Sequence, residues 1–587
     1  MAAALSWERK GMADSRAKEL VDLGNRLFTK RDPLLSLWQE IADNFYTERA
    51  DFLTTHLPGD DFAEHLQDSY PCLLRRELGN SISSMLRPRD RQWFRLSTLD
   101  EERDQNPENA AYMEYVVRKM HRSMYDSRTK FVRATKEGDH DFVTFGQAVI
   151  TVEESRDREH LFYRTFHLRD CAWLENHVGD VDHLHRKDKM SARAMIQYFG
   201  EGKVHKTVRE AMKKNPGQEF NVRCIVMPAE EYDLHGKGKD KMGKKRKLPF
   251  IVVYIDADNC VMLKESPLAD FPYIIPRWHT VSGMQYAYAP TTCIALPDAR
   301  MMQQMARIIL EAGEKSIDPP VVAVEEAVRE VNLAAGAITW ADLSFDGKLR
   351  EAVQPINLNH DMTTAFAMRE DMRELLQKAW FIDKLQMPNA QGADTMTARE
   401  VSVRQQEFVR NLLPLFEPME VEYNTKLLDK SYTLLRGMGL LPSEELPKDL
   451  AGTDVSWAFE SPVQEGSSRL AVSQFQEALQ LVAASMEMGV KSNPIDIDLA
   501  LRDAIRGVSA PSRWFKTEEA LGEEAEERAS QEEDMAMMQE VQALAQTGGM
   551  VADASQKIGQ ASLPPQLTGP GAKPALPPPS GTRSRAA

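Results

Sequence analysis

The segment ALPDARMMQQMARIILEAGEKSIDPPVV, residues 295–322, decides the architecture that the rest of the sequence predicts. Pro297-Asp298 is typical of a helix start, and Pro319-Pro320 ends the helical pattern. Apolar side chains recur between them at helical spacing: Met301, Met302, Met305, Ile308, Ile309 and Ala312. The sequence therefore predicts a helix of about 22 residues, about 33 Å long.

A second long helix is predicted from about Thr363 to Met387-Pro388. Its apolar positions are Phe366, Met372, Leu375, Leu376, Ala379 and Ile382. The insert between the two helices contains strand-like pieces at 321–324, 337–340 and 352–356. This pattern predicts two long rods that are joined through a small distal module.

The sequence that follows the second helix predicts a loop and then a third long helix. PNAQGADTMT, residues 388–397, has the composition of a loop, and Thr397 with Glu400 forms a capping-box pattern. The helix that begins there extends toward Gly437, and Pro414 and Pro418 should kink it.

The N-terminal section, to about Glu137, is predicted to be helical. Asp32-Pro33 indicates a helix start, because it places a capping Asp before a Pro at the first helical position. The apolar face that follows is Leu34, Leu37, Trp38, Ile41, Phe45 and Tyr46. A helix around 70–86 presents Leu74, Leu78, Ile82 and Met85, and a helix after Asn106-Pro107 presents Tyr112, Tyr115, Val116, Met120 and Met124.

From about Phe145 the period changes to that of strands. Ala148, Ile150 and Val152 alternate with polar neighbours, and similar runs follow at 159–168, 220–227, 249–255 and 260–264. Residues 256–259 suit a hairpin turn between the last two runs. We expect a mostly antiparallel sheet with helices packed on it, and hence an α+β fold that is mostly helical.

The C-terminal section is predicted to be helical at 469–488 and roughly 517–545. The stretch 518–534 holds nine acidic residues and one Arg. Beyond Ser562 the chain is rich in Pro, Gly and Ser, so we expect a disordered tail that cannot bury enough apolar area to fold.

The composition limits the classes of function. The 587 residues include 73 basic and 89 acidic side chains, for a net charge of -16. This balance is unusual for a protein that binds DNA tightly, although it suits one through which DNA slides. Five scattered cysteines suggest reduced thiols, and no signal peptide or membrane span is predicted, so we expect a soluble protein without a membrane partner.

The sequence offers little catalytic chemistry, since it contains no HExxH, GxSxG, EF-hand or Rossmann motif. The basic segment 235–247 nearly matches a phosphate-binding loop, but Lys245 replaces the Ser or Thr that holds magnesium, so we interpret it as a solvated hairpin loop. Asp182, His183 and His185, with His177 upstream, could offer metal ligands, and we favour a polar, His-rich loop. Asp139-His140-Asp141 is explained as well by capping or turn hydrogen bonds as by catalysis.

Two alternatives remain open from the residues alone. One is a metal-dependent nuclease built on Asp182, His183 and His185, and the other is a structural protein without catalysis. Because the sequence contains no motif of the common catalytic classes, we expect that the protein is not an enzyme and has no cofactor and no resident metal.

Five separated segments resemble the head-to-tail connector, or portal, proteins of short-tailed bacteriophages. Residues 31–52, 81–96 and 136–153 are similar to the N-terminal half of that family, residues 295–322 to its first stem helix, and residues 395–408 to the helix after its channel loop. Family members usually show a Tyr-Gly-Arg-Gly/Ser-Pro turn before the stem, whereas residues 286–290 are Tyr-Ala-Tyr-Ala-Pro. The resemblance therefore implies no role for residues 286–290.

The resemblance implies a portal-like division of the chain. A wing of helices and antiparallel sheet would cover 1–290, the first stem helix 291–319, a small α/β clip 320–360 and the second stem helix 361–387. A channel loop at 388–397, a kinked long helix returning to the wing at 398–465, a helical crown at 466–561 and the tail at 562–587 would follow.

The resemblance also implies a homo-oligomer, expected to be a dodecameric ring at one capsid vertex, in the virion and, during assembly, in the host cytoplasm. Double-stranded DNA would pass through the ring non-specifically while it is packaged and ejected. Terminase, a tail adaptor, and the major capsid and scaffolding proteins would be its partners. By segment order the channel loop would present Asn389, Gln391, Asp394 and Thr395 to DNA, and the clip would present Asp342, Asp346 and Lys348 to adaptor or terminase. The alternative that we keep beside it is another structural virion protein, such as an adaptor or core protein.

Overall fold

The computed structural model describes residues 2–57, 59–100, 103–104, 106–235, 248–317, 321–323, 353–355, 362–385, 419–442, 446–450, 452, 455–459, 475, 478–480 and 501. All of these lie in one compact unit, residues 1–512. The fold is α+β with small antiparallel sheets, as the sequence predicts.

Helices form most of the N-terminal part, as expected. They are α1 (Ala2–Phe45), η1 (Thr47–Arg49), α2 (Tyr70–Leu86), α4 (Pro107–Met124), η2 (Ser127–Thr129) and α5 (Phe131–Phe145). The predicted apolar face of α2 is confirmed, because Leu74, Leu78 and Ile82 are buried. The side chain of Asn106 caps α4 by accepting a hydrogen bond from the Glu108 amide. On α4 Tyr115 is exposed, whereas Val116, Met120 and Met124 are buried.

The predicted helix start at Asp32-Pro33 is wrong, because Pro33 lies inside the continuous helix α1. Buried side chains hold α1 on both sides of the proline, Phe28 before it and Trp38 after it. Arg31 is also buried and donates hydrogen bonds to the carbonyls of Leu168 and Cys171. Tertiary contacts thus offset the one backbone hydrogen bond that Pro33 cannot donate.

The strands form two main antiparallel sheets, which confirms the expected sheet. One has the order β4-β5-β6-β7-β8 and the other the order β3-β2-β9. The bounds are β2 (Val149–Glu154), β3 (Leu161–Phe166), β4 (Cys171–Glu175), β5 (Val181–Ser191), β6 (Glu219–Pro228), β7 (Phe250–Asp256), β8 (Val261–Leu268) and β9 (Tyr273–Ile274). Between them lie η3 (Leu168–Asp170), α6 (Ala192–Phe199), α7 (Lys206–Lys214) and α8 (Ala229–His235). The predicted hairpin at 256–259 joins β7 to β8.

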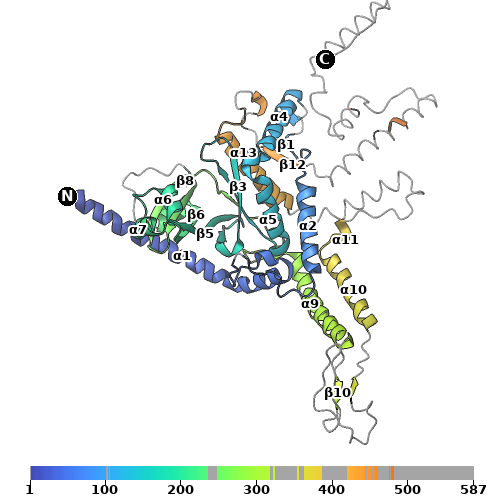
Figure 1. The fold of residues 1–587 in the computed structure, drawn as a ribbon. Coiled ribbons are helices and arrows are strands. Elements are labelled where there is room, and N and C mark those ends of the chain that lie inside the picture. The colour runs from blue at the N-terminus through green and yellow to red at the C-terminus, as the bar shows by residue number, and fades with distance from the viewer. Residues whose placement is uncertain are drawn as a thin grey trace, which may run out of the picture. The chain divides into compact units, whose positions relative to one another are not determined.

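Helix α1 packs along β4 and β8, and α5 packs on β2 and β3 (Figure 1). A further two-stranded sheet pairs β1 (Phe94–Thr98) with β12 (Val455–Phe459), which brings a late segment back to the N-terminal part. A turn of π-helix, η6 (Glu420–Thr425), leads into α13 (Lys426–Gly437), which contacts α4, β2 and β3. A short 3-10 turn, η7 (Lys448–Leu450), precedes β12.

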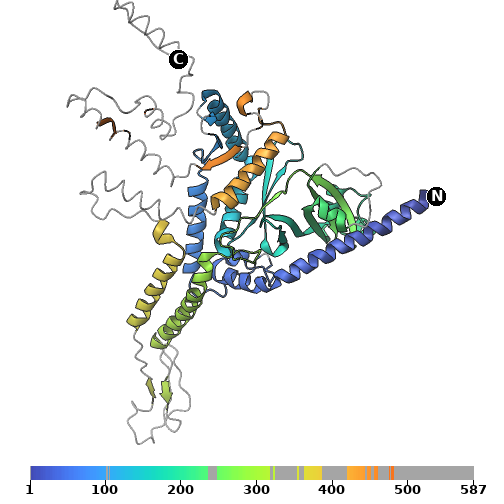
Figure 2. The same cartoon turned by 180° about the vertical axis from the view of Figure 1, so that it is seen from behind.

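Two long helices, α9 (Pro290–Ile317) and α10 (Met362–Ala379), pack along one another (Figures 1 and 2). At the far end of the pair β10 (Val321–Ala323) and β11 (Val353–Pro355) form an antiparallel ladder. The strand-like pieces at 321–324 and 352–356 are thereby confirmed, and the piece at 337–340 lies outside the described residues.

Both predicted boundaries of these helices need correction. Helix α9 begins at Pro290, so Pro297 lies inside it. The second helix ends at Ala379 rather than near Met387, and α11 (Ile382–Leu385) follows after a break. Trp380 is fully buried at the break, with its ring 5.3 Å from that of Phe45, and Phe381 adopts a positive φ of 55°. The helix is therefore interrupted after Ala379, and the interruption accompanies burial of the Trp380 indole.

No helix within the described ranges is long and apolar enough to cross a bilayer.

Candidate functional site: the paired helices and the polar hub beside them

The predicted polar loop at Asp182, His183 and His185 is wrong, because these residues lie on strand β5. Both imidazoles are buried on one face, at 2% and 0% exposure, and their Nε2 atoms are 3.0 Å apart. His183 Nδ1 lies 3.0 Å from the Glu231 carboxylate, so the three groups form a chain of hydrogen bonds rather than a ring of ligands. Among the described residues no three His, Cys, Asp or Glu side chains converge as a metal site would require.

This histidine pair instead joins the sheet to helix α1. A Cβ at Gly24 would lie 2.5 Å from His185 Nδ1, so glycine lets α1 approach the strand closely. Burial lowers the pKa of His185 well below its ordinary value, and the imidazole is therefore neutral at neutral pH. The arrangement suits packing between elements.

Asp139-His140-Asp141 lies inside helix α5, so the expected capping or turn role is wrong. Each of the three buried side chains faces an arginine from another element. Asp139 pairs with Arg87, Asp141 accepts from Arg49 at 2.7 Å, and His140 Nδ1 lies 3.2 Å from Arg75 Nη1. We call these six residues, Asp139, His140, Asp141, Arg87, Arg75 and Arg49, the polar hub.

The polar hub ties α5 to α2, η1 and the π-turn. Arg87 also donates to the Asn424 side chain at 2.7 Å, and its guanidinium lies over the Tyr423 ring at 4.5 Å. A Cβ at Gly79 would lie 2.2 Å from His140 Nδ1, so glycine on α2 leaves the space that the His140 imidazole of α5 fills. Burial lowers the pKa of His140 to about 4, and the nearby Arg75 adds to the effect.

The first turn of α9 is fastened to the end of α5. Thr291 and Thr292 are buried, and their hydroxyls donate to the carbonyls of Val143 and Thr144 at 2.8 and 2.9 Å. Gly146, with a φ of 74°, ends α5 where a Cβ would lie 2.1 Å from the Tyr288 carbonyl carbon. The direction of α9 is therefore fixed by its contacts with α5, the helix that carries Asp139, His140 and Asp141 of the polar hub.

The two long helices also share one anchor, the segment 67–70. Gln303 of α9 accepts from the amides of Gln67 and Asp68, and Arg373 of α10 pairs with the Asp68 carboxylate at 3.3 Å. Gln377 of α10 donates to the Tyr70 hydroxyl at 2.6 Å. These contacts hold the pair together at its base, where Leu376 and Trp380 enter the core.

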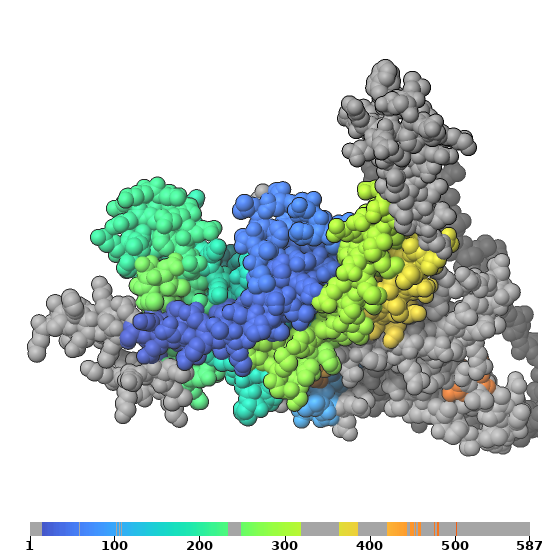
Figure 3. Space-filling model, turned by 90° about the horizontal axis from the view of Figure 1, so that it is seen from below, coloured from blue at the N-terminus to red at the C-terminus, as the bar shows by residue number. Residues whose placement is uncertain are grey.

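Large apolar side chains remain exposed on both helices of the pair, which lie along one another in Figure 3. We call this set the helix-pair face: Ile294, Met301, Ile308, Leu310 and Ile317 on α9, and Phe366, Met368 and Leu375 on α10. Spacings of seven relate 294, 301 and 308, relate 310 and 317, and relate 368 and 375. Residues seven apart differ by only about 20° around a helix, so they form stripes of the kind that pack between helices. Residues two apart differ by about 200°, so the stripe of 310 and 317 lies on the opposite side of α9 from the stripe of 294, 301 and 308, and Phe366 lies on the opposite side of α10 from Met368 and Leu375.

The helix-pair face was not predicted as an exposed surface. Met301, Ile308, Phe366 and Leu375 were predicted only as apolar positions of the two long helices, and no packing partner was assigned to them. The structure buries Ala295, Ala299 and Met302 of α9 and Met372 and Leu376 of α10 instead. The seven-residue spacing was visible in the sequence, and it was the signal for a second apolar stripe.

The residues expected to meet DNA or partner proteins lie outside the described residues. These are Asn389, Gln391, Asp394 and Thr395 of the expected channel loop, and Asp342, Asp346 and Lys348 of the expected clip. The same holds for 236–247 of the basic segment, for Pro414 and Pro418, for most of 466–561 and for the tail.

Comparison with known proteins gives concordant matches over most of the chain. The family model described as bacteriophage head to tail connecting protein matches residues 17–515. The portal protein of Salmonella phage epsilon15 is 23% identical over 544 residues, which cover 91% of this chain and 95% of that protein. A probable portal protein of Bordetella phage BPP-1 is 24% identical over 489 residues, which cover 82% and 84%.

Proposed function

The chain belongs to the family of bacteriophage head to tail connecting proteins, and from this membership we propose that it is the portal protein of a short-tailed phage. In this role it forms the ring at one capsid vertex through which DNA is packaged and ejected. The role is structural, and it needs none of the catalytic sets that the sequence suggested. The two relatives that are named as portal proteins, with similar length, support the proposal.

One observation carries the assembly part of the proposal, namely the helix-pair face. Eight large apolar side chains are exposed on this one pair of helices, and exposed apolar side chains that gather on one element usually mark interaction sites. Stripes with a spacing of seven suit a neighbouring helix as the partner. A ring of identical subunits supplies that helix, because each copy offers its own long helices to the next one.

The division of the subunit follows from the same proposal. The α9–α10 pair is the stem, the β10–β11 end is part of the clip, and the helices and sheets of 1–290 form the wing. Residues 388–397 are the channel loop, with Asn389, Gln391, Asp394 and Thr395 near DNA. Asp342, Asp346 and Lys348 of the clip meet the terminase and later the tail adaptor, and the wing side meets capsid and scaffolding proteins.

A duct for DNA must not hold DNA tightly. The net charge of -16 per subunit, repeated around a ring of about twelve copies, gives the ring a large negative charge that disfavours tight binding of phosphates. This balance supports passage of the duplex without strong binding.

The proposal is tested by negative-stain electron microscopy and light scattering of the purified full chain. We expect rings with an axial hole, and a doubly substituted chain, Met301→Asp with Ile308→Asp, should remain monomeric with an unchanged circular dichroism spectrum. The matched control is Val132→Asp with Val178→Asp, two exposed apolar residues outside the pair, and it should still form rings. A wild-type chain that stays a compact monomer at micromolar concentration would remove the proposal.

A further inference from the structure

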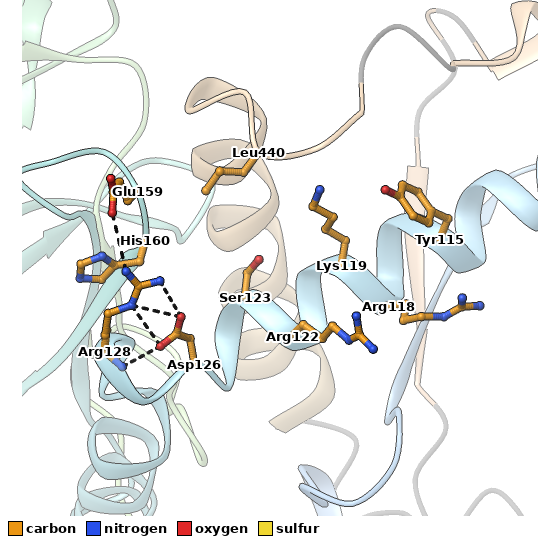
Figure 4. A pocket seen from close by; sticks show the side chains of 10 residues that line it. All are labelled: Tyr115, Arg118, Lys119, Arg122, Ser123, Asp126, Arg128, Glu159, His160 and Leu440. Atoms are coloured by element: carbon orange, nitrogen blue, oxygen red, sulfur yellow. Dashed lines mark hydrogen bonds and ion pairs between the residues drawn. The ribbon is translucent and has the colours of Figure 1, made fainter.

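A basic pocket lies along the C-terminal half of α4, apart from the helix-pair face (Figure 4). Its volume is about 420 Å³. The charged side chains that line it are Arg118, Lys119, Arg122, Asp126, Arg128 and Glu159. Four cations thus face two carboxylates, in a chain whose overall balance is acidic.

Two of the four cations are occupied by carboxylates. Arg128 pairs with Asp126 at 2.9 Å and with Glu159 at 3.7 Å, and Arg118 pairs with Glu114 at 2.6 Å. The pairing with Arg128 lowers the pKa of Asp126 to about 2, so this carboxylate stays ionised and keeps its cation. Figure 4 shows Arg128, Asp126 and Glu159 together, and Arg118 lies apart from them on α4.

Lys119 and Arg122 have no carboxylate partner among the residues that the structure describes. Both are exposed, and they lie three residues apart on α4, about 4.5 Å along the helix axis. The pocket therefore keeps two cations that no carboxylate of the described residues pairs with.

We propose that this pocket binds the phosphodiester backbone of duplex DNA. The inference rests on the proposed function, since a portal is in contact with the packaged duplex. Each strand of the duplex carries one charge per about 3.4 Å of its length, so a run of about 4.5 Å along α4 faces one or two phosphates. The guanidinium of Arg122 matches a phosphate with two parallel hydrogen bonds, and Lys119 adds a point charge.

The composition of the lining favours a nucleic acid over an acidic protein. Six of the ten side chains that line the pocket are charged and four of these are basic, whereas the centres of protein interfaces are depleted of charged residues. Interfaces with DNA are more polar and more positively charged. With Lys119 and Arg122 as the two cations of this pocket that lack a carboxylate partner among the described residues, the contact is weak and sequence-independent, which agrees with DNA that must move.

The test measures binding of a fluorescein-labelled duplex to the assembled full-length ring by fluorescence anisotropy, at several salt concentrations. Each phosphate contact contributes about one to the slope of log affinity against log salt. Lys119→Gln with Arg122→Gln should therefore lower that slope by about two for each subunit that the duplex contacts, and should weaken binding at low salt.

Two controls isolate the pocket. Lys119→Arg with Arg122→Lys keeps the charges and should keep the slope. Lys213→Gln with Lys214→Gln removes two exposed lysines of α7 and should leave the slope unchanged. Ring formation of each variant is followed by negative stain, so that failure of assembly is distinguished from failure of this site.

Three results would overturn the inference. They are wild-type rings that bind no duplex, equal binding by the doubly substituted ring, and a pocket that binds polyglutamate in preference to DNA.

Discussion

The polar hub and the helix-pair face are built from neighbouring elements of one subunit, yet they are completed in opposite ways. In the polar hub, buried charged groups from α5, α2 and η1 each find a partner within the chain. On the helix-pair face, apolar side chains of α9 and α10 stay in contact with water. Thr291 and Thr292 connect the two regions, since they hold α9 to the end of α5.

The difference indicates that the polar hub contributes to folding of the subunit and the helix-pair face to association between subunits. A buried ion pair is costly to break and requires a well-defined geometry, so the polar hub fixes how the helices meet. An exposed apolar stripe contributes little until a partner covers it. Substitutions in the polar hub should therefore change the stability of the subunit, and substitutions on the helix-pair face should change the association between subunits.

The largest effect is expected for Asp139→Ala. This change leaves the Arg87 guanidinium buried without its carboxylate, and loss of one partner of a buried pair costs about 3–5 kcal/mol. Urea denaturation followed by circular dichroism measures the loss. Glu137→Ala, at an exposed carboxylate of the same helix that pairs with Arg133, is the control and should cost less than about 0.5 kcal/mol.

A double substitution, Asp139→Leu with Arg87→Met, tests the cause of that loss. It removes both charges together, so most of the stability should return. If Asp139→Ala were as stable as the Glu137→Ala control, the polar hub would not be the region that fixes the helices.

The pH dependence of the polar hub is expected to be the next largest effect. The pKa of His140 is lowered to about 4 in the folded chain, against an ordinary value of 6.5, so the unfolded chain takes up the proton first as the pH falls. The contribution is fully present above pH 6.5 and is lost as the pH falls toward 4, by about 3 kcal/mol. Thermal melting of wild type and His140→Gln over this range checks it, because Gln keeps an acceptor for Arg75 but does not titrate.

Other histidines lower the stability of both chains at acid pH. Burial lowers the pKa of His167 to about 2, so its effect is common to wild type and variant. Only the difference between the two melting curves reports His140. Parallel curves would assign the acid sensitivity to residues outside the polar hub.

The sequence predicted correctly those helices and strands that are determined by residue patterns within one short segment. The apolar faces of α2 and α4, and the hairpin of β7 and β8, follow from spacing and turn residues within one segment. The two proline signals failed because helix rules describe an isolated segment. At Pro33 and Pro297 the neighbouring turns are held by buried side chains from elsewhere in the fold.

Strand β5 and the polar hub could not be predicted from local patterns for a different reason. The segment VDHLHRKDKMS is so polar that it suggests a loop, but His183 and His185 are buried against α1 and α8. The partner Asn424 of Arg87 is 337 residues away in the chain. The burial of a polar residue can be predicted only when the distant residue that pairs with it is known.

On the helix-pair face a smaller effect is expected from Ile308→Ala. Ile308 is 63% exposed in the subunit, and covering such a side chain in an interface is worth about 1–2 kcal/mol. The variant subunit should keep the wild-type urea midpoint, while the concentration at which rings dissociate rises about tenfold for each interface. Light scattering over a dilution series measures it, and a shifted urea midpoint with unchanged ring dissociation would reverse the assignment.

The smallest effect is expected for Glu311→Ala, one turn further along α9. Glu311 accepts from Arg307 at 3.0 Å in an exposed pair with a spacing of four. Water and salt screen such a pair, so its loss should change the stability of the subunit by less than about 0.5 kcal/mol and should leave ring dissociation nearly unchanged. The exposed side of α9 carries both charged and apolar residues. Comparing this substitution with Ile308→Ala shows which of the two kinds of residue contributes to the contact between subunits. A shift in ring dissociation as large as that of Ile308→Ala would mean that ion pairs, rather than the apolar stripe, join the subunits.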